Sequence, residues 1–360
     1  MRLDDEEFQV PERFYSTDAF TDYAIEFLDE ARQGDKPYFL YLAHNAPHFP
    51  LHALPEDIAK YRGRYDEGWD VIRTRRHRRL VDLGLIDSTW RLSTRDPKVE
   101  KWSELTKPQT EFLIPMMEVY AAMVDRLDQN IGRLVENLRE HDELENTLIL
   151  FFSDNGACPY QRLRTPGVEP GGPASDVAYD ARWANMCNTP LRLYKQYAHE
   201  GGTTTPLIAH WPKVIREGRV STATHHLVDV MPTLAEIASA KYPTEFSGHT
   251  ILPMEGVSMM ATLRGETMEK RPPLYWEFSS NHAIREGRWK LVAQRGKEWE
   301  LYDLSTDRSE TNSVFEERAD VASRLANEYD RWAKRVGAKP HLKCLKTKPS
   351  SQSQLFELPK

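Results

Sequence analysis

Residues Thr147 to Gly156 read Thr-Leu-Ile-Leu-Phe-Phe-Ser-Asp-Asn-Gly. The apolar run that ends at Phe152 is short and uninterrupted, which is typical of a strand buried on both faces of a sheet. Asp154 and Asn155 follow at the carboxyl end of this predicted strand, where open α/β sheets bind their ligands. The stretch therefore predicts an α/β fold with a ligand site at one edge of its sheet.

The side chains of Asp154 and Asn155 indicate a metal site. A carboxylate beside an amide oxygen offers the hard oxygen ligands that Ca²⁺ or Mg²⁺ prefers. The alternative is a type I′ hairpin turn at Asn-Gly, but such a turn needs a paired strand directly afterwards, and Ala-Cys-Pro at 157–159 does not resemble one. We expect Gly156 to let the two side chains converge by adopting a positive φ.

Apolar periodicity elsewhere along the chain supports an α/β core. A second short apolar run predicts another strand buried on both faces at 38–43, and a third strand is predicted at 206–211. Helical spacing of apolar residues predicts helices over 17–31, 111–140 and 232–240. Because strands alternate with helices, we expect a largely parallel or mixed sheet flanked by helices.

The pattern changes after residue 245, where a joint rich in proline and glycine begins. Beyond it, short polar turns separate predicted strands at 274–278, 288–293 and 299–304, and a helix is predicted over 320–336. We therefore expect three parts: an α/β core over 1–245, a small antiparallel α+β subdomain over 246–345, and a disordered tail over 346–360.

Composition limits the classes of function. The 360 residues carry a net charge of −7, which argues against nucleic-acid binding through a general basic surface. Hydrophobic residues make up 40% of the chain, enough for a core, but no apolar run approaches the length of a membrane span. A basic run at 73–79 is interpreted as a solvated helix face, and a basic rim that attracts an anionic substrate is the alternative.

Two further residues lie near predicted strand ends. His48 is held between prolines in Ala-Pro-His-Phe-Pro-Leu, and these prolines exclude a helix that would present His44, His48 and His52 to a metal. A rigidly held histidine can bind an oxyanion or protonate a leaving group, and a loop histidine bonded to nearby backbone is an equal alternative. Lys195 precedes a Gly-Gly turn and could bind a tetrahedral anion at the same edge, but taken alone a surface lysine is the simpler interpretation.

The order of these motifs resembles one family. Ala-Pro-His-x-Pro-Leu at 46–51, Phe-Ser-Asp-Asn-Gly at 152–156, and Arg-Leu-Tyr-Lys at 192–195 before Gly-Gly and a Pro-Leu-Ile strand resemble the type I sulfatases, in particular bacterial arylsulfatases. The stretches at 286–291 and 300–304 resemble the C-terminal subdomain of that family. The resemblance implies a core like that of the alkaline phosphatase superfamily. It also implies hydrolysis of sulfate monoesters, with a small-molecule or saccharide sulfate ester as substrate.

Carried over by position, the resemblance implies roles for four residues. Asp154 and Asn155 would be two ligands of an active-site Ca²⁺. His48 would contact the sulfate group or serve the leaving oxygen, and Lys195 would bind a sulfate oxygen. For the full-length family a periplasmic or secreted location is implied, but the first residues show no signal-peptide pattern, so the compartment is left open.

The chain departs from the family at the nucleophile. The family oxidises the Cys or Ser of a Cys-x-Pro-x-Arg or Ser-x-Pro-x-Arg signature to formylglycine, and none of Cys158, Cys187 and Cys344, nor any serine, stands in such a signature. An Asp-Asp metal pair at the end of the first core strand and a Gly-Lys-Trp-His-Leu-Gly segment are missing too. Since all the missing parts belong to the N-terminal half of the family core, we expect the later portion of a sulfatase, with an incomplete core and inactive alone. The alternatives are a phosphate or phosphonate monoester hydrolase of the same superfamily and a non-catalytic binding or scaffold relic.

Overall fold

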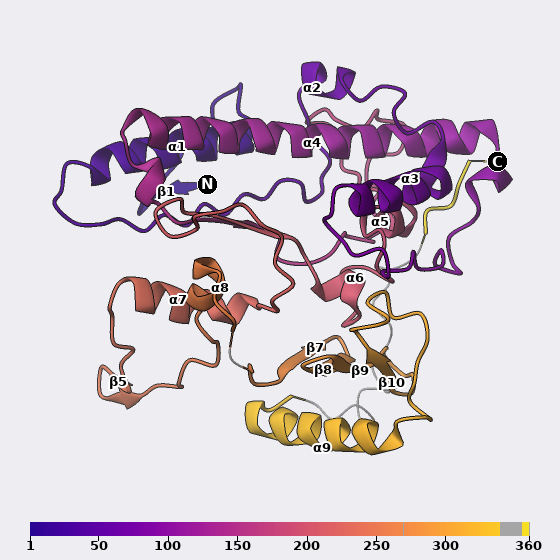
Figure 1. Cartoon of the computed structure of the whole chain (residues 1–360). Coiled ribbons are helices and arrows are strands. Elements are labelled where there is room, and N and C mark those ends of the chain that lie inside the picture. The colour runs from indigo at the N-terminus through magenta and orange to yellow at the C-terminus, as the bar shows by residue number, and fades with distance from the viewer. Residues whose placement is uncertain (269, 339–354, 360) are drawn as a thin grey trace.

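The computed structural model describes residues 1–268, 270–338 and 355–359 (Figure 1). A layer of helices lies along one side of the molecule, and a four-stranded sheet covered by one helix lies along the other (Figure 1). This arrangement confirms the α/β class with a small antiparallel C-terminal sheet. Within the described ranges, every helix is too short or too polar to cross a lipid bilayer.

The helical layer is built around one long helix, α4 (Lys107–Glu140), which packs side by side with α1 (Ser16–Ala31). An ion pair joins the two helices, because Arg126 donates to both carboxylate oxygens of Asp18 at 2.7 and 2.5 Å. Both helices were predicted; each begins slightly earlier than the apolar pattern indicated. The layer is completed by α2 (Pro55–Ala59), α3 (Gly68–Asp82) and α5 (Ala181–Cys187), with a short 3₁₀ helix at Trp102–Glu104.

The predicted core strands at 147–152 and 206–211 are present as β3 (Ile149–Phe152) and β4 (Leu207–His210). They pair with each other in antiparallel register, with Ile149 opposite His210, so this described pair agrees with the expected mixed sheet and not with a wholly parallel one. Phe151 is 39% exposed, so β3 is not buried on both faces. The reason is local: among the described residues β3 pairs only with β4, and its other side has no strand to cover it.

The prediction of a strand at 38–43 is also wrong. This segment forms no ladder in the structure, and its aromatic side chains Phe39 and Tyr41 are 71% and 80% exposed. The apolar run is present in the sequence, but an extended segment becomes a strand only where a neighbour accepts its hydrogen bonds. Tyr38 anchors the start of the segment by donating to Glu143 at 3.0 Å.

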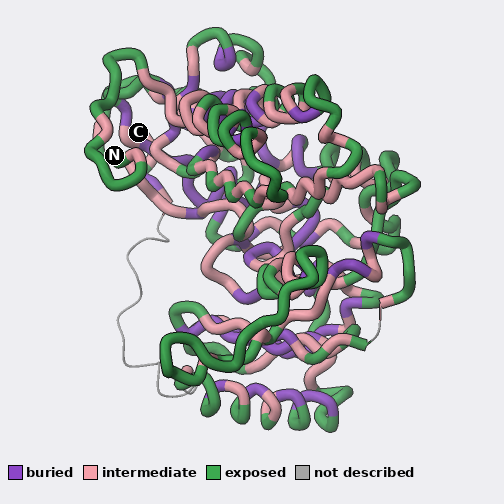
Figure 2. Tube along the Cα trace, turned by 90° about the vertical axis from the view of Figure 1, so that its left-hand side faces the viewer, coloured by how far each residue is buried: buried purple, intermediate pink, exposed green. Residues whose placement is uncertain are grey.

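The C-terminal sheet has the order β10–β9–β8–β7, with every neighbouring pair antiparallel, as predicted for this region. Its strands are β7 (Leu274–Phe278), β8 (Asn281–Glu286), β9 (Trp289–Ala293) and β10 (Glu300–Asp303). One face packs Ile284, Leu291 and Leu301 against α9 (Ala319–Val336). Buried and exposed residues alternate along that helix, as expected for a helix with one covered side (Figure 2).

The region between the core and this sheet contains α7 (Val230–Ile237), the short strands β5 (Glu245–Phe246) and β6 (His249–Thr250), and α8 (Met260–Arg264). Met259, Met260 and Leu263 pack against Leu150 of β3 and Ala209 of β4. The chain therefore returns to the core strands after residue 245 before it enters the C-terminal sheet. The remaining elements are β1 (Arg2–Leu3), β2 (Glu6–Glu7), α6 (Glu200–Thr203) and 3₁₀ helices at Leu144–Asn146 and Leu227–Asp229.

Part of the predicted disordered tail is ordered. Phe356 is 3% exposed, and its backbone N–H donates to the buried carboxylate of Asp180 at 3.2 Å. Its ring lies 5.9 Å from that of Phe112 on α4. Apolar burial therefore anchors residues 355–359 to the core, whereas the rest of the predicted tail, and Cys344, lie outside the described residues.

A buried ion cluster joins the C-terminal sheet to the core. The ammonium of Lys290 on β9 is fully buried, 2.7 Å from a carboxylate oxygen of Glu200 and 3.1 Å from one of Glu310. The second oxygen of Glu200 accepts from Thr204 at 2.7 Å and is paired with Arg308. Burial lowers the pKa of Lys290 to about 8. Since Glu200 belongs to α6 and Lys290 to the sheet, the cluster fixes the two parts against each other.

The exposed aromatic residues at 38–43 predict self-association of the purified chain, because flat apolar surface beside unpaired backbone invites contact between copies. Replacing both Phe39→Ser and Tyr41→Ser should lower the oligomer fraction measured by sedimentation velocity at high protein concentration. Leu252→Ser, at a side chain 85% exposed elsewhere, serves as the matched control. A wild-type chain that stays monomeric across the concentration range would contradict this prediction.

Candidate functional site

Asp154 and Asn155 lie in the loop directly after β3. Thr205 donates to the backbone oxygen of Ser153 at 2.8 Å, and the Gly156 N–H donates to Gly202 O at 3.1 Å. A Cβ atom at Gly156 would lie 1.9 Å from Gly201 O, so only glycine allows this close approach. Its φ is not positive, which corrects our expectation: Gly156 is required for packing against the Gly-Gly turn rather than for a left-handed twist.

The lysine loop, residues 188–202, lies against the same segment. Lys195 is half-buried, and its backbone N–H donates to Ala157 O at 3.0 Å. The side chain of Asn188 joins the loop to the segment after β3: its Oδ1 accepts from Ala157 N at 3.0 Å, and its Nδ2 donates to Leu193 O and Gly201 O at 2.9 and 2.6 Å. Asn188 therefore holds the Lys195 loop and the Asp154–Asn155 loop in one arrangement.

His48 reaches the lysine loop through two aromatic rings. The ring of Phe49 lies 4.2 Å from that of His48 and 6.0 Å from that of Tyr160. The ammonium of Lys195 lies over the Tyr160 ring at 5.7 Å, and Gln196 donates to the Tyr160 hydroxyl at 2.8 Å. His48 and Lys195, which are 147 positions apart in the sequence, are therefore connected by Phe49 and Tyr160.

The geometry at His48 determines which ring nitrogen carries the hydrogen in the neutral tautomer. Nδ1 lies 2.8 Å from the carbonyl oxygen of Phe49, and since a carbonyl can only accept, Nδ1 carries the hydrogen. Nε2 is then the nitrogen left for a ligand: it accepts when the ring is neutral and donates to an oxyanion when the ring is protonated. His48 itself is exposed to solvent, so an anion can reach it.

The structure thus brings together the loops that carry the four predicted residues, and it joins them through residues that the sequence analysis did not single out. Phe49, Tyr160 and Asn188 make the connecting contacts. Phe49 and Tyr160 are adjacent to predicted residues or motifs in the sequence, but nothing local indicates that their rings meet. The assignment of His48, Lys195, Asp154 and Asn155 to sulfate and calcium stays a prediction.

The donor chemistry of Asp154 and Asn155 suits calcium, but the set is too small. Calcium takes six to eight oxygen ligands, and two side chains supply only a fraction of them. In the part of the chain that the structure describes, no group of three or more His, Cys, Asp or Glu side chains could hold a metal ion. The described residues therefore do not form a complete calcium site by themselves.

The basic run lies on α3, in the helical layer. Arg75, Arg76, Arg78 and Arg79 are exposed, which agrees with a solvated helix face, and the alternative of a basic rim stays a prediction. Arg73 is the exception, because it is buried and donates to the backbone and hydroxyl oxygens of Ser93 at 3.0 Å. Burial lowers the pKa of Arg73 to about 10.

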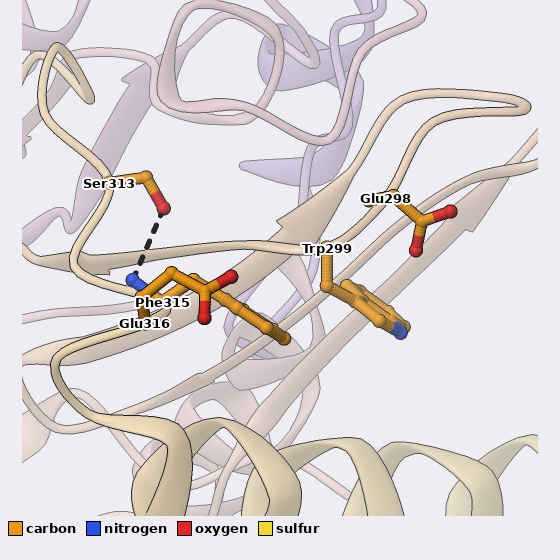
Figure 3. A pocket seen from close by; sticks show the side chains of 5 residues that line it. All are labelled: Glu298, Trp299, Ser313, Phe315 and Glu316. Carbon is orange, nitrogen blue, oxygen red and sulfur yellow. Dashed lines mark hydrogen bonds between the residues drawn. The ribbon is translucent and has the colours of Figure 1, made fainter.

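A pocket of about 360 Å³ opens on the C-terminal subdomain (Figure 3). Its lining includes Trp299 and Phe315 together with two exposed carboxylates, Glu298 and Glu316. None of the four predicted site residues lines it. Carboxylates repel an anionic ligand, so this pocket does not suit a sulfate group.

Comparison with known proteins identifies the family to which the chain belongs. The family model described as "Sulfatase" matches residues 2–240, and the model described as "N-sulphoglucosamine sulphohydrolase, C-terminal" matches residues 192–334. The chain therefore belongs to the sulfatase family.

Individual relatives agree with this membership. The chain is 36% identical over 334 residues to an uncharacterized sulfatase of Schizosaccharomyces pombe and 33% identical over 287 residues to an arylsulfatase of Klebsiella aerogenes. These alignments cover 87% and 75% of the chain but 60% and 61% of the two relatives, so the chain spans about three fifths of their length.

Solved structures confirm the fold. The chain matches the crystal structure of Ps i-CgsB with a TM-score of 0.63 and 26% identity, over 96% of this chain and 64% of that one. A second match, at TM-score 0.59 and 20% identity over 91% of this chain and 71% of that one, is a protein in complex with its substrate D-glucosamine-2-N,6-O-disulfate. These likenesses establish an α/β sulfatase-like fold with a small C-terminal antiparallel sheet.

The lysine loop is also held by Glu300 of β10. Its carboxylate accepts from Arg192 at 3.1 Å and Tyr302 at 2.7 Å, and lies 3.0 Å from Nε2 of buried His199. Burial alone would raise the pKa of Glu300, but the His199 hydrogen bond and the Arg192 charge outweigh it and lower the pKa to about 2. Glu300 is therefore ionised throughout the neutral and mildly acidic range.

This lowered pKa predicts acid sensitivity. Because the folded-state pKa lies below the ordinary value of 4.5, the stability contributed by Glu300 is complete above pH 4.5 and is lost as the pH falls toward 2. Between pH 5 and 3, the wild type should lose about 1 to 2 kcal/mol more of its free energy of unfolding than Glu300→Gln, as measured by urea denaturation. Glu317→Gln, at an exposed carboxylate, should behave like the wild type. Parallel pH profiles for wild type and Glu300→Gln would refute the assignment.

Proposed function

We propose that this chain carries the sulfate-binding loops and two of the calcium ligands of a sulfuric ester hydrolase. Membership in the sulfatase family supports the reaction class. The observation that supports the proposal is the contact series from His48 through Phe49 and Tyr160 to Lys195, whose loop also contacts the segment that follows Asp154 and Asn155.

In this proposal each residue has one task. Lys195 provides a point charge for a sulfate oxygen, and Nε2 of His48 donates to a second oxygen or to the leaving oxygen when the ring is protonated. Asp154 and Asn155 contribute oxygen ligands to a calcium ion, which in such enzymes neutralises charge on the transferring group. The described residues do not complete that ion's coordination.

The proposed substrate class is a sulfate ester of a phenol or a saccharide. A relative in Klebsiella aerogenes is named an arylsulfatase, and one in Bacteroides thetaiotaomicron, 26% identical over 85% of this chain and 59% of its own length, is named an N-acetylglucosamine-6-O-sulfatase. The structure of Ps i-CgsB is also known in complex with k-i-k-neocarrahexaose, a saccharide. Both substrate types place the same anionic group in the site.

Sulfate binding tests the proposal directly. Inorganic sulfate titrated against the purified chain at low ionic strength, followed by NMR, should bind, and Lys195→Ala should weaken binding about tenfold because a charge-assisted hydrogen bond is lost. His48→Ala should weaken it less, and Lys241→Ala, at an exposed lysine, should not change it. Absence of binding would refute the proposal, and tighter binding of phosphate than of sulfate would favour the phosphate or phosphonate hydrolase.

We further propose that the chain does not turn over aryl sulfates by itself, because no Cys or Ser stands in the formylglycine signature. Loss of a covalent nucleophile costs on the order of 10⁶-fold in rate where it has been measured in a hydrolase. Purified chain incubated with 4-nitrophenyl sulfate and excess calcium should release no 4-nitrophenol above the buffer control. Calcium-dependent release that is abolished by Asp154→Ala would overturn this expectation.

A further inference from the structure

The segment after the Asp154–Asn155 loop folds back beside His48. Leu51 N donates to Val177 O at 3.0 Å, Ala178 N donates to Arg162 O at 2.9 Å, and Arg164 N donates to Asp176 O at 3.0 Å. These backbone hydrogen bonds fix the arginine loop, residues 160–178, against the chain three positions after His48. The backbone that carries Arg162 and Arg164 is thus fixed by the fold near the proposed sulfate site.

Arg162 contacts the same aromatic ring as His48, that of Phe49. Its guanidinium carbon is 5.1 Å from the centroid of the Phe49 ring, whose neighbours also include the rings of His48 and Tyr160. A cation over an aromatic face is held by the ring quadrupole, which gives Arg162 a defined position. The arginine loop is therefore one ring away from His48.

Two arginines of this loop share one carboxylate, because the loop's other carboxylate, Glu169, pairs with Arg62 outside the loop at 3.2 Å. Arg162 donates through two nitrogens to the two carboxylate oxygens of Asp176, one of them at 2.8 Å, and this pairing lowers the pKa of Asp176. Arg164 shares the same carboxylate at the longer distance of 3.9 Å, and its side chain is 70% exposed. Around Asp176, two guanidinium groups face one carboxylate, and the more loosely paired of the two is the exposed Arg164.

We propose that Arg164 binds a second anionic group of the substrate, so that the site prefers sulfate esters that carry another sulfate or a carboxylate. The inference rests on the proposed function, because it places the first sulfate at His48 and Lys195. Arg162 acts as a positioning residue: it holds Asp176 and the Phe49 ring, and its pairing with Asp176 leaves the guanidinium of Arg164 available to a ligand. The planar guanidinium suits both oxyanions, since each accepts two parallel N–H donors.

Three ligands test the preference on the purified full chain: a monosulfated glucose, a disulfated glucose and a monosulfated glucuronic acid. We expect the wild type to bind at least one of the two ligands with a second anion about tenfold more tightly than the monosulfated glucose, as judged by NMR titration. Arg164→Gln should remove this preference while changing the affinity for monosulfated glucose less than about twofold. Arg164→Lys keeps the charge and should retain part of the preference.

Arg78→Gln, at an exposed arginine of α3, is the matched control and should change no affinity. A preference limited to the disulfated ligand assigns the second group as sulfate, and one limited to the glucuronate ligand assigns it as carboxylate. Equal binding of all three ligands to the wild type, or an equal loss for all three in Arg164→Gln, overturns the inference while the proposed function stands. Failure of every ligand to bind overturns both.

Discussion

The fully buried ammonium of Lys290, between the carboxylates of Glu200 and Glu310, is the interaction on which the arrangement of the molecule depends. A buried ion pair gains little over an apolar contact of the same shape, but removing one partner leaves a charge without compensation and typically costs about 3 to 5 kcal/mol. The cluster therefore restricts how the two parts pack: the C-terminal sheet can pack against the core only in the position that pairs all three groups. The two parts also meet through apolar contacts, such as Tyr302 and Val292 beside Ala198. These contacts tolerate small shifts of the sheet and select its position less strictly.

The same cluster determines the shape of the candidate site. Glu200 begins the helical turn that ends the lysine loop, and the glycines of this turn contact both Arg192 of that loop and Gly156 after β3. A subdomain that carries none of the four predicted site residues thus holds in place the loops that carry them. The Glu300 contacts with Arg192 and His199 add a second connection of the same kind.

Local sequence patterns predicted most elements and missed what depends on partners distant in the chain. Apolar periodicity located α4, β3, β4 and the bounds of β7, because each reflects its own residues. It failed at 38–43, where an apolar run lacks a neighbouring strand, and at β8, which begins with the polar pair Asn281 and His282. In the site, the motifs identified the loops, but the role of Gly156 and the meeting of the Phe49 and Tyr160 rings depend on contacts across the fold.

The close packing at Gly156 has a consequence for how the site can vary. Any side chain there, or at Gly202, would collide with backbone, so the half of the site that contains Lys195 and Asp154 is closed to substitution at its turns. By contrast, a Cβ atom at Gly172 in the arginine loop would have nothing within 4 Å. A library built to change ligand preference is therefore best confined to the exposed residues 172–174, because Gly171 is packed against Ile58 and Leu163 against the core.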